Sequence, residues 1–243
     1  MTVETKDYAV RTIQGDTLTP ISIFNALQGE HKVLFESNAK YDESGRYSFI
    51  AANPIAELKG GKDCCIYTQN GETATLNVSV LEQLKRCLPI RSGNYPFAFF
   101  GGAIGYFGYE TAFHFERIGD IVNDVYNMPD VHVFFYDTFI VIDHLLQTVT
   151  VAAIDLFQTG RTIADMERAI ADIEEQLNTQ QAQSTEEPPA ISFNTTIEKA
   201  RFIEMVETAK EHIRKGDIFQ VVLSQTFEAN FDGNPFGLYR KLR

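Results

Sequence analysis

Phe35, Glu36, Ser37 and Arg46 place an aromatic ring, a carboxylate, a hydroxyl and a guanidinium close together in the chain. The carboxylate can accept hydrogen bonds from a cation, and the guanidinium can face a second carboxylate. A Glu-Ser pair that follows an apolar run is more often a solvated strand end. The residue types therefore allow a binding site, and an ordinary strand end is the alternative reading.

Gln220 lies in the apolar run 216–225, GDIFQVVLSQ. Its amide cannot take up a proton at physiological pH, so it cannot act as a general base. It is either a non-basic residue that faces an active site or a polar strand residue near a cleft.

Four glycines, Gly101, Gly102, Gly105 and Gly108, lie in an aromatic-rich segment. Their spacing does not fit G-x-G-x-x-G, and the surrounding pattern is that of a strand rather than a helix. Glycines inside a strand usually permit close backbone packing or a bulge. We expect that structural role here.

No metal-binding pattern appears among the histidines and cysteines. Cys64 and Cys65 are too crowded to act as a convincing pair of ligands, and no histidine has metal-ligand spacing with cysteine or acidic partners. A P-loop, a nucleophile elbow and a catalytic dyad are also absent from the sequence. The five histidines are His31, His114, His132, His144 and His212.

The charge balance argues against nucleic acid as a partner. The chain has 21 basic and 33 acidic residues and a net charge of −12, which repels a polyanion. No apolar run approaches the roughly 20 residues that span a bilayer. The first eight residues are polar and acidic, unlike a targeting segment, and three cysteines suggest reduced thiols. We expect a soluble, cytoplasmic protein without a membrane partner.

The periodicity predicts a mixture of strands and helices along the chain. Asn70-Gly71 is expected to form the turn of a hairpin, and Thr162 with Asp165 a capping box. Thr195 with Glu198 predicts a second capping box, before a helix that Gly216 closes. Strands are predicted at 31–37, 46–52, 55–59, 64–68, 73–77, 97–109, 131–143, 148–156 and 218–227, with 131–143 and 148–156 as one long hairpin. Helices are predicted from 19, 78, 162, 195 and 235 onward, with the apolar residues of the fourth forming a buried face.

The segment 178–190, NTQQAQSTEEPPA, lacks apolar periodicity and is the best candidate for a linker. It divides the chain into an N-terminal domain, 1–177, and the start of a second domain, 191–243. The chain ends within the apolar helical pattern 236–242. We therefore expect it to be a fragment of a longer protein.

Three segments together resemble the large subunit of anthranilate synthase, component I. Residues 33–37 (VLFES) and 45–50 (GRYSFI) are similar to its "LLES … RYSF" signature. Residues 100–106 (FGGAIGY) resemble its glycine-rich strand, and 216–225 the start of its chorismate-utilising core. The order and spacing of these matches make them much more specific together than each one is alone.

This resemblance implies a tryptophan site at Phe35, Glu36, Ser37 and Arg46, at which tryptophan acts as feedback inhibitor. A free amino acid needs an acceptor for its ammonium, donors for its carboxylate and an apolar wall, and these residues can supply them. Phe35 departs from the family's second leucine, which could alter the pocket's shape. Gln220 occupies the place of a lysine that activates water in relatives making isochorismate or salicylate, so ammonia chemistry fits better here.

The resemblance also implies the fold class, α/β (α+β), with antiparallel sheets and flanking helices. For the complete protein, it implies a Mg²⁺-dependent lyase of tryptophan biosynthesis. It would convert chorismate and ammonia to anthranilate and pyruvate, with ammonia from a glutamine amidotransferase subunit, component II. The family's magnesium and chorismate ligands lie beyond this sequence, so we expect the chain alone to be inactive. Two alternatives remain: the large subunit of aminodeoxychorismate synthase, and a non-catalytic module that binds tryptophan or docks an amidotransferase.

Overall fold

The computed structural model describes residues 7–37, 45–88, 95–96, 98–117, 126–179, 189 and 191–243. The chain forms two compact units, Met1–Gln181 and Ala182–Arg243, and each is described by itself. Most of the predicted linker 178–190 lies outside the described residues.

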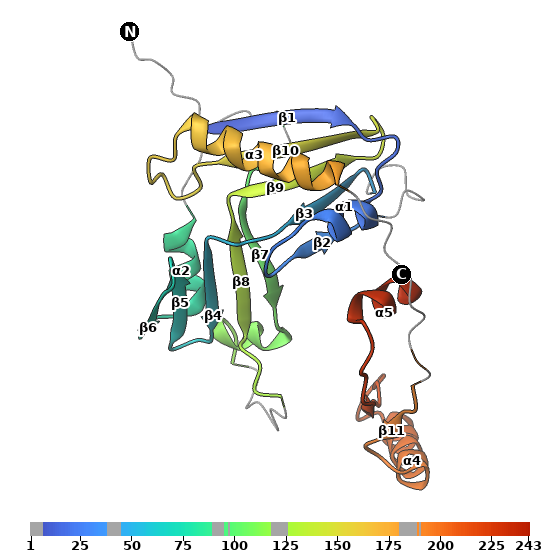
Figure 1. Ribbon diagram of the computed structural model, residues 1–243. Helices are drawn as coiled ribbons and strands as arrows, with labels where there is room; N and C mark the ends of the chain where they lie inside the picture. Colours follow the sequence, from blue (N-terminus) through green and yellow to red (C-terminus); the bar gives the residue numbers. More distant parts are fainter. Residues whose placement is uncertain are drawn as a thin grey trace. The chain divides into compact units, whose positions relative to one another are not determined.

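The first sheet of the first unit is antiparallel and is buried on both faces. Its interior strand β9 alternates between two hydrophobic cores, so that Phe139 and Val141 face one and Ile140 and Ile142 the other. Two helices, α1 (Pro20–Ala26) and α3 (Ile163–Asn178), cover the second face (Figure 1). The strand order is β1 (Tyr8–Gln14), β10 (Thr148–Ile154), β9 (Thr138–Asp143), β3 (Tyr47–Ala51) and β2 (Val33–Phe35).

The second sheet is also antiparallel and shares its core with the other face of the first sheet. The helix α2 (Val80–Cys87) packs against it, and a 3-10 helix, η1 (Tyr109–His114), follows its edge strand. This arrangement confirms the predicted antiparallel sheets with flanking helices. The strand order is β6 (Glu72–Leu76), β5 (Cys65–Gln69), β4 (Ala56–Gly60), β8 (Val131–Tyr136) and β7 (Gly102–Phe107).

Asp137 separates two strands that the sequence predicted as one. The predicted hairpin of 131–143 with 148–156 is correct only for β9, because β8 pairs with β4 and β7 in the second sheet. Figure 1 shows β8 and β9 running in different directions. Asp137 lies in this bend, where Arg161 contacts its carboxylate at 2.8 Å. Burial raises the pKa of Asp137, and the Arg161 charge partly opposes that rise.

The capping box and the hairpin turn predicted for the first unit are confirmed. Thr19 caps α1 and Pro20 is its first residue, while Thr162 and Asp165 form a complete capping box on α3. The hairpin turn between β5 and β6 is also as expected, since Asn70-Gly71 has positive φ at both residues, 53° and 78°.

The second unit departs from its prediction in three respects, one in the segment before β12 and two in α4. Residues 218–226 form no regular strand, and only Phe227 of the predicted strand lies in the short β12. The only strand pairing among the described residues of this unit is that of β11 with β12, over two residues each. A longer strand at 218–226 therefore has no partner strand with which to form hydrogen bonds. The elements are β11 (Asn194–Thr195), α4 (Lys199–Lys215), β12 (Phe227–Glu228) and α5 (Pro235–Leu242).

The helix α4 ends as predicted but begins differently. Gly216 closes it in the left-handed conformation, with φ of 78°. Its N-cap is Glu198, which makes no capping hydrogen bond through its side chain, so the predicted Thr195–Glu198 box is wrong. Its apolar face is also not buried, since no residue of α4 is in a core and Ile203 is 52% exposed. The described part of this unit has no core against which that face could pack.

Candidate functional site

The ends of β2 and β3 bring the predicted binding residues into one region. The two strands are antiparallel, and Phe35 pairs with Phe49. Glu36 and Ser37 leave the end of β2 beside the start of β3, where Arg46 directly precedes Tyr47. Ser37 and Ser48, 11 positions apart in sequence, thereby become neighbours.

Ser48 links this region to the turn between β9 and β10. Its hydroxyl is fully buried and accepts a hydrogen bond from the backbone N–H of Ser37 at 3.0 Å. The same oxygen forms a hydrogen bond with Nε2 of His144 at 2.7 Å. The hydroxyl of Ser48 is thus shared between two segments that are far apart in sequence.

The guanidinium of Arg46 is held by the carboxylate of Asp143. Nε donates to both carboxylate oxygens at 3.1 and 3.0 Å, and Nη2 donates to Oδ2 at 2.6 Å. These hydrogen bonds lower the pKa of Asp143. The guanidinium also lies 4.9 Å from the centre of the Tyr47 ring. Arg46 therefore presents a fixed orientation, and an additional acceptor would have to bind beside Asp143.

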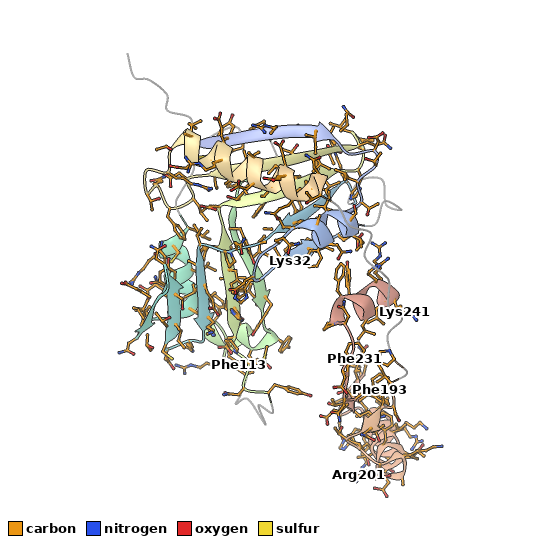
Figure 2. All side chains as sticks on the ribbon, viewed as in Figure 1. Lys32, Phe113, Phe193, Arg201, Phe231 and Lys241 are labelled. Carbon is orange, nitrogen blue, oxygen red and sulfur yellow. The ribbon has the colours of Figure 1, made fainter. Side chains whose placement is uncertain are left out.

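Phe35 is the last residue of β2, and Lys32 directly precedes that strand. The Phe35 side chain is 52% exposed at the sheet edge and offers an apolar surface. Lys32, labelled in Figure 2, donates through Nζ to the carbonyls of Phe24 and Leu27 at 2.8 and 3.0 Å. Burial lowers the pKa of Lys32. Its hydrogen bonds join the C-terminal end of α1 to the chain entering β2.

The glycine-rich segment has the structural role predicted for it. Gly105 is in β7, and a Cβ atom at this position would lie 2.0 Å from the carbonyl oxygen of His132. The strands β7 and β8 could not approach so closely with any other residue there.

A second polar group lies in the other sheet and was missed by the sequence analysis. Glu57 accepts a hydrogen bond from Lys59 at 2.8 Å and pairs with His132 Nε2 at 2.7 Å. Burial acts to raise the pKa of Glu57, but these hydrogen bonds outweigh it and lower the pKa overall. Residues 57 and 59 are two apart in a strand, so the sequence indicates that their side chains lie on the same face. No local pattern indicates that His132 lies beside them.

Two pockets lie away from the predicted residues. A pocket of about 590 Å³ is lined by Lys59, Tyr106 and His132, together with the chain around Asp130. The hydroxyl of Tyr106 is buried and has no hydrogen-bond partner among the described residues. A smaller pocket of about 230 Å³ lies where β3 and β9 meet α3. Neither pocket is lined by Phe35, Glu36, Ser37 or Arg46.

Gln220 belongs to the second unit, in the irregular segment between α4 and β12, and its side chain is exposed. Within the described ranges, no three His, Cys, Asp or Glu side chains are grouped so that they could hold a metal ion. Over the same ranges, no helix has the length and apolar character needed to cross a membrane.

Comparison with known proteins identifies the family. The profile of the chorismate binding enzymes matches residues 30–243, and the chain therefore belongs to this enzyme family. It is 34% identical to anthranilate synthase component 1 of Lactococcus lactis, over 96% of this chain and 52% of that protein. It is 31% identical to the protein of the same name from Aquifex aeolicus, over 94% of this chain and 49% of the relative.

A solved structure supports the same relationship. The chain is similar to anthranilate synthase component I from Streptococcus pneumoniae, with a TM-score of 0.70 and 34% identity. The match covers 96% of this chain and 52% of that structure. The chain thus spans about half the length of the relatives that it matches.

Proposed function

We propose that this chain is the N-terminal part of the large subunit of an anthranilate synthase. The observation that supports this most strongly is 34% identity to anthranilate synthase component 1 over 96% of the chain. The complete protein would add ammonia to chorismate and release pyruvate to leave anthranilate. The ammonia would come from glutamine through an amidotransferase subunit.

The chemistry of this reaction is assigned to the part of the relatives that this chain does not cover. Mg²⁺, which would neutralise developing negative charge on the substrate, finds no fitting set of three His, Cys, Asp or Glu ligands among the described residues. Gln220 remains a proposed residue of the active site, where its amide could contact substrate but not remove a proton.

We assign to the first unit a regulatory role, the binding of L-tryptophan at Phe35, Glu36, Ser37 and Arg46. Glu36 would accept hydrogen bonds from the ammonium group, and Phe35 would contribute an apolar surface for the indole. Arg46, which Asp143 holds in one orientation, would present its remaining donors to the carboxylate. The arrangement suits a ligand that carries both charges.

The catalytic part of this proposal is tested with chorismate, Mg²⁺ and ammonia. The 243-residue chain should release no anthranilate, whereas a version extended to the length of its relatives should do so. Turnover by the short chain would contradict the assignment of the chemistry to the uncovered part. An extended protein that makes aminodeoxychorismate and releases no pyruvate would favour the aminodeoxychorismate synthase alternative.

The regulatory part is tested by binding measurements with L-tryptophan. The chain contains no tryptophan, so the added ligand is the only indole in the sample and its fluorescence anisotropy reports binding directly. Glu36→Gln should weaken binding of tryptophan but leave binding of indole-3-propionate, which lacks the ammonium group, nearly unchanged. Glu72→Gln, on an exposed strand of the other sheet, is the matched control. Equal affinity of the Glu36 variant and the control for tryptophan would reject this site.

A further inference from the structure

The backbone of Ser37 is held by a side chain rather than by the sheet. The β2–β3 pairing consists of Val33, Leu34 and Phe35 and goes no further. Two residues beyond it, the N–H of Ser37 donates to the hydroxyl of Ser48 at 3.0 Å. The position of the Glu36–Ser37 segment therefore depends on a hydroxyl from the neighbouring strand.

That hydroxyl has little freedom to move. Ser48 is 0% exposed, and a hydroxyl has one donor and two acceptor sites. Its oxygen accepts from Ser37 and also forms the hydrogen bond with His144 Nε2 at 2.7 Å. Because the site is buried, water cannot readily replace either partner, and loss of the hydroxyl would leave the Ser37 N–H without this acceptor.

His144 is fixed in turn by the residue that precedes β3, the strand that carries Ser48. Its backbone N–H donates to the carbonyl of Arg46 at 2.9 Å. The preceding residue, Asp143, binds the guanidinium of Arg46. Asp143 at the end of β9 and His144 directly after it thus hold two of the groups on which the proposed ligand site depends. Asp143 holds Arg46 directly, and His144 holds Ser37 through Ser48.

We propose that Ser48 and His144 are positioning residues that set the affinity of the tryptophan site through the Ser37 backbone. This inference rests on the proposed function, because it concerns the same site. Neither residue needs to touch the ligand. Ser48 acts by fixing the segment that carries Glu36, and His144 acts by fixing Ser48.

The test compares Ser48→Thr with Ser48→Val by tryptophan anisotropy and by hydrogen exchange at the Ser37 amide. The two variants add similar bulk to the buried site and differ in the hydroxyl. The Ser48→Val variant should bind tryptophan between about 2-fold and 12-fold more weakly than the Ser48→Thr variant. This factor corresponds to the loss of one neutral hydrogen bond. The Ser37 amide should exchange faster in the Val variant, while the amides of the β2–β3 pairing stay protected.

Two further variants keep the test decisive if the buried position tolerates neither substitution. His144→Leu removes the partner of Ser48 without altering β3, and it should weaken binding in the same direction. Thr12 lies on β1, the edge strand opposite β2, and its hydroxyl pairs with that of Thr150. Thr12→Val removes this hydroxyl and should change neither readout. If Ser48→Thr and Ser48→Val bind tryptophan with equal affinity, this inference alone is overturned. Equal tryptophan affinity of His144→Leu and the unmodified chain would overturn it in the same way. An unmodified chain that does not bind tryptophan would overturn the proposed site and this inference together.

Discussion

Arg46 donates to both carboxylate oxygens of Asp143, although the two residues are 97 positions apart in sequence. The contact joins the chain before β3 to the end of β9. Asp143 is 8% exposed, and its Oδ1 also accepts the N–H groups of Leu145 and Leu146 at 3.0 Å. One carboxylate therefore closes the turn after β9 and orients the arginine of the proposed ligand site.

Asp143→Asn should destabilise the first unit by about 1.5–3 kcal/mol at neutral pH, because it removes the charge from these hydrogen bonds. The pKa of Asp143 is lowered in the folded state by the Arg46 hydrogen bonds. The stabilisation is therefore present above the unfolded pKa of about 3.9 and is lost as the pH falls through the folded pKa. Urea unfolding at several pH values should show the difference between the two proteins shrinking in acid.

Asp143→Ala provides the comparison for this variant. It also removes the acceptor for the Leu145 and Leu146 N–H groups, so it should be the less stable of the two. A difference between wild type and Asp143→Asn that is constant from neutral pH to below pH of about 3 would contradict the electrostatic explanation.

Ile170→Ala in α3 should cost about 2–5 kcal/mol of unfolding free energy, since Ile170 is 1% exposed in the core beneath the helix. Ile203→Ala in α4 removes the same atoms from a side chain that is 52% exposed, and should change stability by less than about 0.5 kcal/mol. Thermal and denaturant unfolding of both variants measure this contrast. Similar losses would mean that the α4 face is buried in solution.

Gly105→Ala should destabilise the second sheet by roughly 3 kcal/mol or more, because the new Cβ would meet the carbonyl oxygen of His132. The glycine of the β5–β6 turn is the control. Gly71 has positive φ but open space around it, so Gly71→Ala should cost only about 1 kcal/mol of backbone strain. Circular dichroism melting curves should rank the two variants in this order.

Cys64 should react first with a limiting amount of iodoacetamide, as it is the exposed cysteine of the three. Burial raises the pKa of the Cys65 and Cys87 thiols, which lowers their thiolate fraction. Peptide mass spectrometry of the alkylated protein locates the label, and Cys64→Ser should remove the fast phase. A fast phase that persists in this variant would show that Cys65 or Cys87 is accessible.

The features that were predictable from sequence are those that a few neighbouring residues determine. Thr162 and Asp165 satisfy the first turn of α3 by themselves, and Asn70-Gly71 supplies the two positive φ angles of its hairpin. The bend at Asp137 was not predictable, because both sides of it read as continuous β-structure. Only the pairing partners, β4 and β7 for β8, decide that the chain changes sheets.

In the candidate site, too, residues with a local sequence pattern were predictable and residues brought in from distant parts of the chain were not. The motif residues Glu36, Ser37 and Arg46 were identified from their local pattern, and the β2–β3 register brings them to one end of the sheet. Asp143 and His144 were not identified as parts of the site, since nothing local signals contacts across more than 90 residues. In the second unit, apolar periodicity predicted a buried helix face, but periodicity does not supply the partner that buries it.

The pairing of β1 with β10 has a consequence for the order in which the chain can fold during synthesis. Tyr8 pairs with Ile154 and Gln14 with Thr148, so β1 leaves the ribosome well before its partner, which follows only after most of the first unit has been translated. The strand β3 can pair with β2 early, but its other neighbour in the sheet, β9, is translated much later. Such non-local pairing makes folding slow. The nascent chain must therefore keep its early apolar strands from associating with other chains until residue 154 has emerged.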